Sequence, residues 1–462
     1  MAEAATSLRL DDIVHRQHSI HIHWCVDRYH FETSLRYADV DLDDLRVSVD
    51  AVTWQRLLFH IALFEMSKGV NLRPRELDLG RWGVFFTPEV AAVWRRVVQG
   101  VFAQWRWQRD DADAPVPMAP LRAAPYAPRR RPLGEVSLLA FCGGGKDSLV
   151  SAHLLESAEL PWGAFVYSNS SYGSHAHQQE LIDRLLAHLR PAHVHRLEID
   201  DSFVDSFSAP PGQEVVVAET PTSIMASLPV VLRYGYEHIV LGHERSANKG
   251  SFVWERTGED INHQWGKSRE AEVLLSEYVT HALIDSFSYF SILQPVHDPV
   301  IFSSLRHRAS AAPSTHSCNQ SKPWCMKCPK CLYVWLGYSA WLPWRTVDDC
   351  FDGINPLVDV TTHDTLAAIL GISGHLPFEC IGQAAESRLF AHMLRARYPE
   401  AADLAVLDSC PPPDAAAVSQ LLSVYPEDFG APGWVASPVL RNLDQEATSA
   451  RSEISRLLGV TF

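Results

Sequence analysis

The segment Phe141-Cys142-Gly143-Gly144-Gly145-Lys146-Asp147-Ser148 is the strongest indication of the fold. It ends a short apolar run, Val136 to Phe141, and opens a segment with helical character, Lys146 to Leu160. Three successive glycines let the backbone turn sharply and approach a ligand closely. The free N–H groups at the start of the helix then point at anionic oxygens. Strand, glycine loop and helix in this order predict a phosphate-binding loop, in which Lys146 adds positive charge and Ser148 a hydroxyl donor.

Strands and helices alternate along the following hundred residues. Strands are predicted at Ala164 to Ser168, His193 to Ile199 and Ile239 to Leu241, and helices at Gln179 to Leu189 and Ile224 to Tyr234. This alternation predicts βαβ units and a parallel sheet covered by helices on both faces, which is an α/β fold. Ligands of such sheets bind beyond the carboxyl ends of the strands.

The regions on either side of this core differ from it in composition. Residues 1–108 mix strand-like and helix-like runs and predict an N-terminal α+β domain. Residues 109–134 contain six prolines, which cannot continue a helix or a central strand, and predict a linker. We expect the nucleotide-binding core at residues 135–317, a cysteine cluster at 318–331 and a mainly helical region at 332–462.

Composition limits the classes of partner. The 462 residues carry 40 basic and 55 acidic side chains, a formal net charge of −15, so there is no overall basic field for nucleic acid. An anionic substrate therefore requires a local basic pocket. The N-terminal residues have no apolar core of the signal-peptide type, and no apolar run is long enough to span a membrane. With nine cysteines, an odd number, we expect a cytoplasmic protein with reduced thiols.

The glycine loop is not a Walker A loop, because the four-residue spacer before Gly-Lys-Ser/Thr is missing. It resembles the PP-loop, whose usual form is Ser-Gly-Gly-x-Asp-Ser, with Gly143 standing where that motif usually has serine. The resemblance implies an ATP-binding core in which Gly143, Gly144, Gly145 and Ser148 hold the phosphates, and in which Lys146 and Asp147 are catalytic. It also implies cleavage of ATP to AMP and pyrophosphate, with Mg²⁺ as the accompanying ion.

Polar residues crowd the ends of two other predicted strands. Tyr167 and Ser168 end the second strand, where PP-loop proteins receive the adenine and ribose. The fourth strand ends in Gly242, His243 and Glu244, which we assign to the nucleotide as well. The residues that follow, or that lie in the similar segment 262–268, are candidates for binding the substrate; an ordinary solvated loop is the alternative. These candidates are Arg245, Asn248, Lys249, Asn262 and Lys267.

Four cysteines, Cys318, Cys325, Cys328 and Cys331, lie within fourteen residues. Their C-x6-C-x2-C-x2-C spacing is suited to a closed tetrahedral Zn²⁺ site of structural type. An iron–sulfur cluster and a cluster without metal are the alternatives. The scattered cysteines at 25, 142, 350, 380 and 410 are typical of core or surface thiols, and the histidines at 15, 18, 21 and 23 of strand and loop residues.

The glycine loop, the Gly-His-Glu segment and the cysteine cluster together resemble two families. The queuosine-precursor synthase is similar in its PP-loop and its four clustered cysteines, but it is much shorter. A closer resemblance is to the MurL family, the UDP-N-acetylmuramoyl-L-alanyl-L-glutamate epimerases, over most of residues 135–385. The stretches that carry it are Cys142–Ser148, Gly242–Asn248, Asn262–Gln264, Ser317–Asn319, Trp324–Cys331 and Pro377–Gly382.

The MurL resemblance implies ATP- and Mg²⁺-dependent inversion of the terminal L-glutamate of a UDP-muramoyl dipeptide, for peptidoglycan synthesis. Adenylation removes the negative charge of a carboxylate, which makes its α-hydrogen acidic enough for a base to take. Cys380, His243 and His263 are the candidate bases. A PP-loop enzyme that modifies tRNA or a nucleobase, and a nucleotide-binding regulatory module without turnover, are the competing classes.

Overall fold

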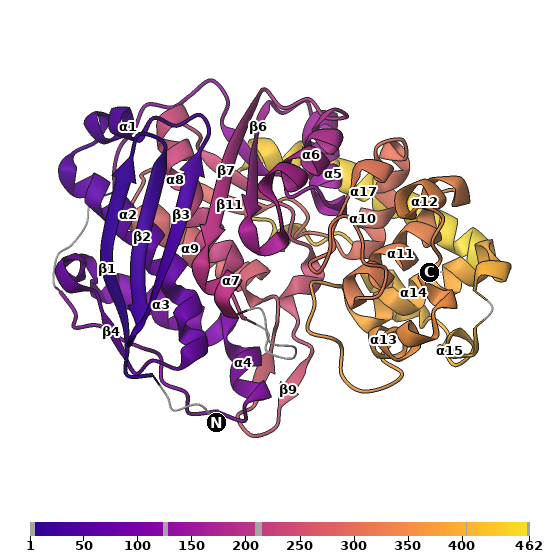
Figure 1. Cartoon of the computed structure of the whole chain (residues 1–462). Helices are drawn as coiled ribbons and strands as arrows, with labels where there is room; N and C mark the ends of the chain where they lie inside the picture. The colour runs from indigo at the N-terminus through magenta and orange to yellow at the C-terminus, as the bar shows by residue number, and fades with distance from the viewer. Residues whose placement is uncertain (1–4, 123–127, 208–214, 403, 460–462) are drawn as a thin grey trace.

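A computed structural model describes residues 5–122, 128–207, 215–402 and 404–459 of the chain. Nine strands form one mixed sheet, shown with its helices in Figure 1. In spatial order they are β11 (Ser288–Ser291), β8 (His238–Leu241), β5 (Leu138–Phe141), β6 (Trp162–Asn169), β7 (His193–Asp201), β3 (Tyr29–Tyr37), β2 (Ser19–Val26), β1 (Ser7–Arg16) and β4 (Glu76–Asp78). A separate hairpin joins β9 (Phe252–Trp254) to β10 (Glu259–Ile261).

The five strands from β11 to β7 are parallel, which confirms the α/β core predicted from the sequence. The sheet does not end at β7, however. Strand β3 pairs with β7 in antiparallel register, with Thr33 opposite Asp201 and Tyr37 opposite Leu197, and β2 and β1 follow antiparallel. The N-terminal strands thus extend the same sheet, and the sheet is mixed rather than purely parallel.

The helices, in chain order, flank this sheet and then fill the C-terminal region. They are α1 (Leu42–Ser48), α2 (Ala51–Glu65), α3 (Pro88–Val101), α4 (Ala103–Gln108), α5 (Lys146–Ser157), α6 (His175–Leu186), α7 (Ser202–Phe207), α8 (Glu219–Tyr234), α9 (Arg269–Ala282), α10 (Asp298–Ser304), α11 (Pro329–Trp341), α12 (Trp344–Phe351), α13 (His363–Ile369), α14 (Ala384–Arg397), α15 (Ala405–Asp408), α16 (Ala415–Leu421) and α17 (Gly433–Leu458). The mainly helical C-terminal region is as predicted.

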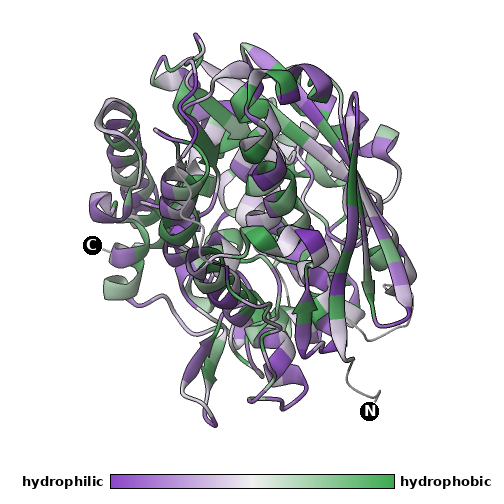
Figure 2. Ribbon diagram, turned by 90° about the vertical axis from the view of Figure 1, so that its left-hand side faces the viewer, coloured by the Kyte–Doolittle hydropathy of each residue, from purple (hydrophilic) through white to green (hydrophobic). Residues whose placement is uncertain are grey.

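Each face of the parallel strands belongs to a different hydrophobic core, because successive side chains of a strand point to opposite faces. Leu139 of β5 packs in the core that includes residues of α2, α8 and α9. Its neighbours Leu138 and Ala140 pack in the core that includes residues of α5, α11 and α17. In Figure 2 the helices carry hydrophobic and hydrophilic bands, as amphipathic helices do. Within the described residues, no helix is long and apolar enough to cross a membrane.

The described parts of residues 109–134 form neither a helix nor a strand of the sheet. Their backbone bonds to several elements: Leu77 donates to the carbonyl of Met118, Arg129 donates to that of Leu283, and Gly134 to that of Gly235. The segment therefore contacts strand β4 and the residues that follow helices α8 and α9. The domain limits set out above stay a prediction.

His60 of α2 links the N-terminal helices to α9. Its side chain is fully buried; Nδ1 lies 2.6 Å from the carbonyl oxygen of Arg56, and Nε2 bonds to the hydroxyl of Tyr278. Burial lowers the pKa of this imidazole from 6.5 to about 4. The folded chain thus holds a neutral histidine at pH values where the unfolded chain protonates it.

This histidine predicts an acid-side loss of stability. As pH falls from 6.5 toward about 4, the unfolded state gains a proton that the folded state does not, so His60 lowers the free energy of unfolding by up to about 1.4 kcal/mol per pH unit. Urea unfolding between pH 7.5 and 4.5 should show a shallower pH slope for His60→Gln than for the wild type. His23→Gln, at a half-buried position of β2, serves as the control and should leave the slope unchanged. An equal slope for wild type and His60→Gln would contradict the assignment.

Candidate functional site: a glycine-loop cleft and a cysteine knuckle

The order of the parallel strands defines where a ligand binds. From β5 the chain proceeds to β6 and β7 on one side, and then returns to β8 on the other side of β5. Connections that leave two adjacent strands in opposite directions open a crevice at their carboxyl ends. The glycine loop follows β5 and the Gly242-His243-Glu244 segment follows β8, so both predicted nucleotide segments lie at this crevice.

A cleft is present at this position, with an empty volume of about 1270 Å³ that includes its open mouth. Ten of the predicted site residues line it: Gly143, Gly145, Asp147, Ser148, Tyr167, Gly242, His243, Glu244, Lys267 and Cys380.

The glycine loop leads directly into α5. Gly145 is the N-cap residue and supplies no side-chain cap, so the first N–H groups of the helix remain available to an anion. Gly144 has a φ of +84°, and a Cβ there would lie 2.0 Å from Cε1 of His316. The amide of Gly143 donates to Oγ of Ser148 at 3.1 Å, which ties the loop to the first turn of the helix. Only glycine fits at position 144, where backbone conformation and space both exclude a side chain.

Lys146 does not point into the cleft. Its side chain is buried, and Nζ donates to Oδ1 of Asp147 at 2.5 Å and to Oδ1 of Asp298 at 2.7 Å. Tyr333 donates to the other oxygen of Asp298 at 2.6 Å. Burial, followed by charge repulsion from Glu244 and other carboxylates, raises the pKa of Asp298 to about 7 even though Lys146 opposes this. Lys146 therefore lies beneath the loop and orients Asp147, whose carboxylate lines the cleft.

Three lysines give the cleft a local positive charge: Lys267, Lys322 and Lys330. None of them forms an ion pair with a carboxylate within the described parts of the chain. Three carboxylates, Asp147, Glu219 and Glu244, also line the cleft. Cations and carboxylates in one cleft are the groups that bind phosphate oxygens and a divalent metal ion. A chain of net charge −15 thus gathers three cations in one cleft, where an equal number of carboxylates balances their formal charge.

The candidate bases are placed differently. His243 lines the cleft, its Nδ1 is buried without a partner, and burial followed by the charge of Lys267 lowers its pKa to about 3. Cys380 also lines the cleft and accepts a hydrogen bond from Lys267. Burial lowers the pKa of Lys267, but the electrostatic attraction of Cys380 and Glu244 outweighs burial, so the pKa of the lysine is raised. His263 lies outside the cleft lining and bonds to Gln104 through Nδ1.

Four of the five candidates for substrate binding lie outside the cleft lining. Arg245 pairs with Asp428, and its guanidinium carbon lies 3.5 Å from the ring centroid of Tyr425. Asn248 accepts from the amide of Arg269 at 2.7 Å. Asn262 donates to the carbonyl of Ala247 at 2.8 Å, and Lys249 is exposed. Ser168, a nucleotide candidate, is buried beside His175. Their assigned roles stay predictions.

A second wall of the cleft consists of residues that the sequence did not predict as site residues. Its side chains come from the start of α8, from Tyr172 and from the chain that leads into the cysteine cluster. The missed residues are Tyr172, Gln178, Glu219, Thr220, Ser223, His316, Ser317, Asn319, Lys322 and Lys330. The one available signal was the basic character of the segment between Cys318 and Cys331.

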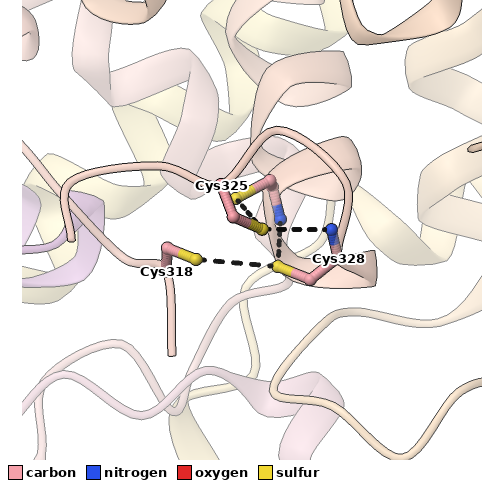
Figure 3. Close-up of side chains that lie close together, drawn as sticks. Cys318, Cys325 and Cys328 are labelled. Atoms are coloured by element: carbon pink, nitrogen blue, oxygen red, sulfur yellow. Dashed lines mark hydrogen bonds between the residues drawn. The ribbon is translucent and has the colours of Figure 1, made fainter. Parts of the chain in front are cut away.

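The four cysteines form a compact knuckle, residues 318–331, in which all four Sγ atoms lie within 4.8 Å of one another. In Figure 3 the sulfur atoms of Cys318, Cys325 and Cys328 point toward a common centre. Backbone N–H groups also point at the sulfurs: Ser321 donates to Cys318 at 3.3 Å and Cys328 donates to Cys325 at 3.3 Å. Such bonds offset the negative charge of thiolate ligands.

The spacing of the sulfurs fits a single tetrahedral ion. Cys318 and Cys328 have their Sγ atoms 3.9 Å apart, and those of Cys325 and Cys331 are 3.8 Å apart. A tetrahedron with Zn–S bonds of about 2.3 Å has edges of about 3.8 Å. In an iron–sulfur cluster the thiolates bind different iron atoms and spread farther apart. The geometry is therefore consistent with a closed, structural Zn²⁺ site.

Fold and site together define an α/β protein whose glycine loop and charged cleft lie at the switch point of a parallel sheet. The family models identify its relatives more narrowly. The MurL N-terminal domain matches residues 216–292, and the MurL C-terminal domain matches residues 310–420. Models of both MurL domains thus match parts of the chain, in agreement with the resemblance of its motifs. The two models include the His243 and Lys267 side of the cleft and the whole knuckle, while the glycine loop lies before them.

Three curated relatives carry the name UDP-N-acetyl-alpha-D-muramoyl-L-alanyl-L-glutamate epimerase. The chain is 30% identical to the Micromonospora protein over 279 residues, 59% of each chain. It is 30% identical to that of Salinispora tropica, over 56% of this chain and 54% of the relative. It is 28% identical to that of Xanthomonas oryzae pv. oryzae, over 57% and 58%. These matches span little more than half of each relative's length.

The knuckle geometry predicts about one equivalent of zinc per purified chain. Metal binding free energy adds to the free energy of folding, so Cys328→Ser should lose the metal and lower the unfolding temperature. Cys350→Ser, a buried cysteine of α12 outside the knuckle, is the matched control and should keep the metal. Elemental analysis measures the metal and calorimetry the stability. Wild-type protein with neither zinc nor iron would disprove the metal site.

Proposed function

We propose that the chain is an ATP-dependent epimerase that inverts the terminal L-glutamate of UDP-MurNAc-L-Ala-L-Glu, through an acyl-adenylate, in peptidoglycan synthesis. One observation carries this proposal: the glycine loop and the Lys267–Cys380 pair line the same cleft. A loop suited to phosphates and a thiol suited to proton transfer are thereby within reach of one bound substrate. The names of the curated relatives support the choice of substrate.

The first step transfers AMP to the substrate. A carboxylate oxygen of the glutamate attacks the α-phosphorus of ATP, and pyrophosphate leaves. N–H groups at the start of α5 are placed to bind the phosphates, and Asp147 and Glu244 are the carboxylates of the cleft lining that would hold Mg²⁺. Pyrophosphate release makes this step PP-loop chemistry, in which AMP rather than ADP is the product.

The second step inverts the α-carbon. The acyl-adenylate has no carboxylate charge, so its α-hydrogen can be taken by a base and an enolate forms. Of the bases in the cleft, His243 is a weak one, because its pKa is about 3. Cys380 is the better candidate, and the ammonium of Lys267 beside it can stabilise the negative charge of the enolate. A proton returned to the opposite face gives the D-centre, and hydrolysis of the adenylate releases AMP. The cytoplasmic location of this reaction stays a prediction.

Asp147→Asn tests the adenylation site. The substitution preserves the size of the side chain but removes the charge that Mg²⁺ and Lys146 require, so we expect AMP formation to fall by about 100-fold or more. Asp285→Asn, at a half-buried position after α9 and outside the cleft lining, should keep wild-type activity. Lys146→Ala is less informative, because it leaves Asp298 buried without its cation. Undiminished AMP formation by Asp147→Asn would contradict the assignment.

Isotope incorporation tests the reaction. In D₂O with ATP, Mg²⁺ and the muramoyl dipeptide, the inverted glutamate should carry deuterium at Cα, because the α-hydrogen leaves and a solvent proton replaces it. AMP and pyrophosphate should form in step with inversion, without ADP. Chiral analysis and mass spectrometry read the glutamate, and ³¹P NMR the nucleotides. Inversion without AMP would disprove the adenylate, and AMP without inversion or exchange would disprove the substrate.

A further inference from the structure

The knuckle contributes more than a fold-stabilising metal site, because its own residues line the cleft. Asn319, Lys322 and Lys330 all lie between the first and last metal ligands, Cys318 and Cys331, and all three line the cleft. Four thiolates bound to one metal ion restrict the conformation of the chain between them. The positions of these two lysines are therefore set by the knuckle.

The chain that enters the knuckle also contacts the glycine loop directly. The amide of His316 donates to the carbonyl of Gly144 at 2.8 Å, and a Cβ at Gly145 would lie 2.9 Å from Oγ of Ser317. His316 is 2% exposed, and its Nδ1 has no hydrogen-bond partner although its side chain lines the cleft. A buried, unpartnered polar atom in a cleft lining marks a position where a ligand is expected.

The two knuckle lysines, Lys322 and Lys330, line the cleft and are available to bind an anion. Lys322 lies with Nζ 5.4 Å from the ring centroid of Tyr172, another residue of the cleft lining. Glu219 acts on Lys322 more strongly than Lys330 does, so a carboxylate and a second lysine both lie near it at the cleft. Lys330 donates to the carbonyl of Cys380. Neither is neutralised by an ion pair within the described residues.

We propose that the knuckle is the second wall of the phosphate site, with Lys322 and Lys330 binding phosphate oxygens opposite the glycine loop. Metal occupancy and phosphate binding are then coupled, because the same segment serves both. This inference rests on the proposed binding of ATP, but it does not depend on the epimerase reaction. The pyrophosphate part of the nucleotide is then bound by side chains of the knuckle as well as by the glycine loop.

Lys327 provides a matched control on the same knuckle. It lies between the second and third metal ligands, is exposed, and pairs with Asp359 at 3.3 Å, outside the cleft lining. Lys322→Met and Lys327→Met thus remove the same charge from the same segment, one inside the cleft and one outside it. Metal content and unfolding temperature of both variants show whether the knuckle has formed.

The first measurement is the affinity of the metal-loaded chain for Mg²⁺-pyrophosphate, by calorimetry. A charge-assisted hydrogen bond contributes enough that Lys322→Met should weaken binding about tenfold or more, whereas Lys327→Met should leave it unchanged. Equal affinities for the wild type and Lys322→Met would overturn the proposal. An equal loss in both variants would overturn it too, because the effect would then be one of general charge.

The second measurement is the affinity of the chain for the metal, by competition with a chelator. Coupled binding free energies are reciprocal, so saturating pyrophosphate should tighten metal binding by the wild type by about fivefold or more. Lys322→Met should lose this effect while Lys327→Met keeps it. A metal affinity that pyrophosphate does not change would refute the coupling. Failure of pyrophosphate to bind would refute this wall and ATP binding together, whereas coupled binding without inversion of the dipeptide would refute only the proposed substrate.

Discussion

The contact between Gly144 and His316 is the constraint that the cleft depends on. With a φ of +84° and no room for a Cβ, Gly144 lets the loop after β5 pass directly under the imidazole. That contact brings two segments far apart in sequence, the glycine loop and the knuckle, into the lining of one cavity. The hydrogen bond that the N–H of His316 donates to the carbonyl of Gly144, at 2.8 Å, adds a directed link. A side chain at position 144 would separate the walls.

The sheet supplies the platform for this contact. Strands β5 and β8 are adjacent, and the segments that follow them diverge, so their carboxyl ends leave a crevice that helices do not fill. Beneath the loop, the buried pair of Lys146 and Asp298 joins α5 to α10, and Tyr333 of α11 completes it. Because α11 begins within the knuckle, at Pro329, this polar network connects the helix after the glycine loop to the helix that leaves the knuckle.

Local sequence order predicted the core well, since strand, glycine loop and helix follow one another without interruption between Leu138 and Ser157. The cysteine spacing likewise predicted a cluster that the geometry supports. Both are short-range patterns. The pairing of β3 with β7 joins segments whose separation exceeds any local period, so the sheet extension could not be foreseen.

The same restriction to short-range patterns explains which site residues the sequence predicted and which it did not. Arg245 follows β8 directly, but its partner Asp428 comes from the far C-terminal region and draws the guanidinium away from the cleft. Lys322 and Lys330 reach the cleft only because the knuckle packs against the loop, a contact between distant segments. Net charge could show that a basic pocket was needed, but not which lysines would form it.

The central claim is that phosphates lie between the glycine loop and the knuckle. A crystal structure of the chain with Mg²⁺ and α,β-methylene ATP, which cannot be cleaved at the reacting bond, tests it most directly. We expect phosphate oxygens in contact with the N–H groups at the start of α5 on one side and with Lys322 on the other. A nucleotide bound elsewhere on the chain, or bound here with its phosphates in contact with neither wall, would contradict it.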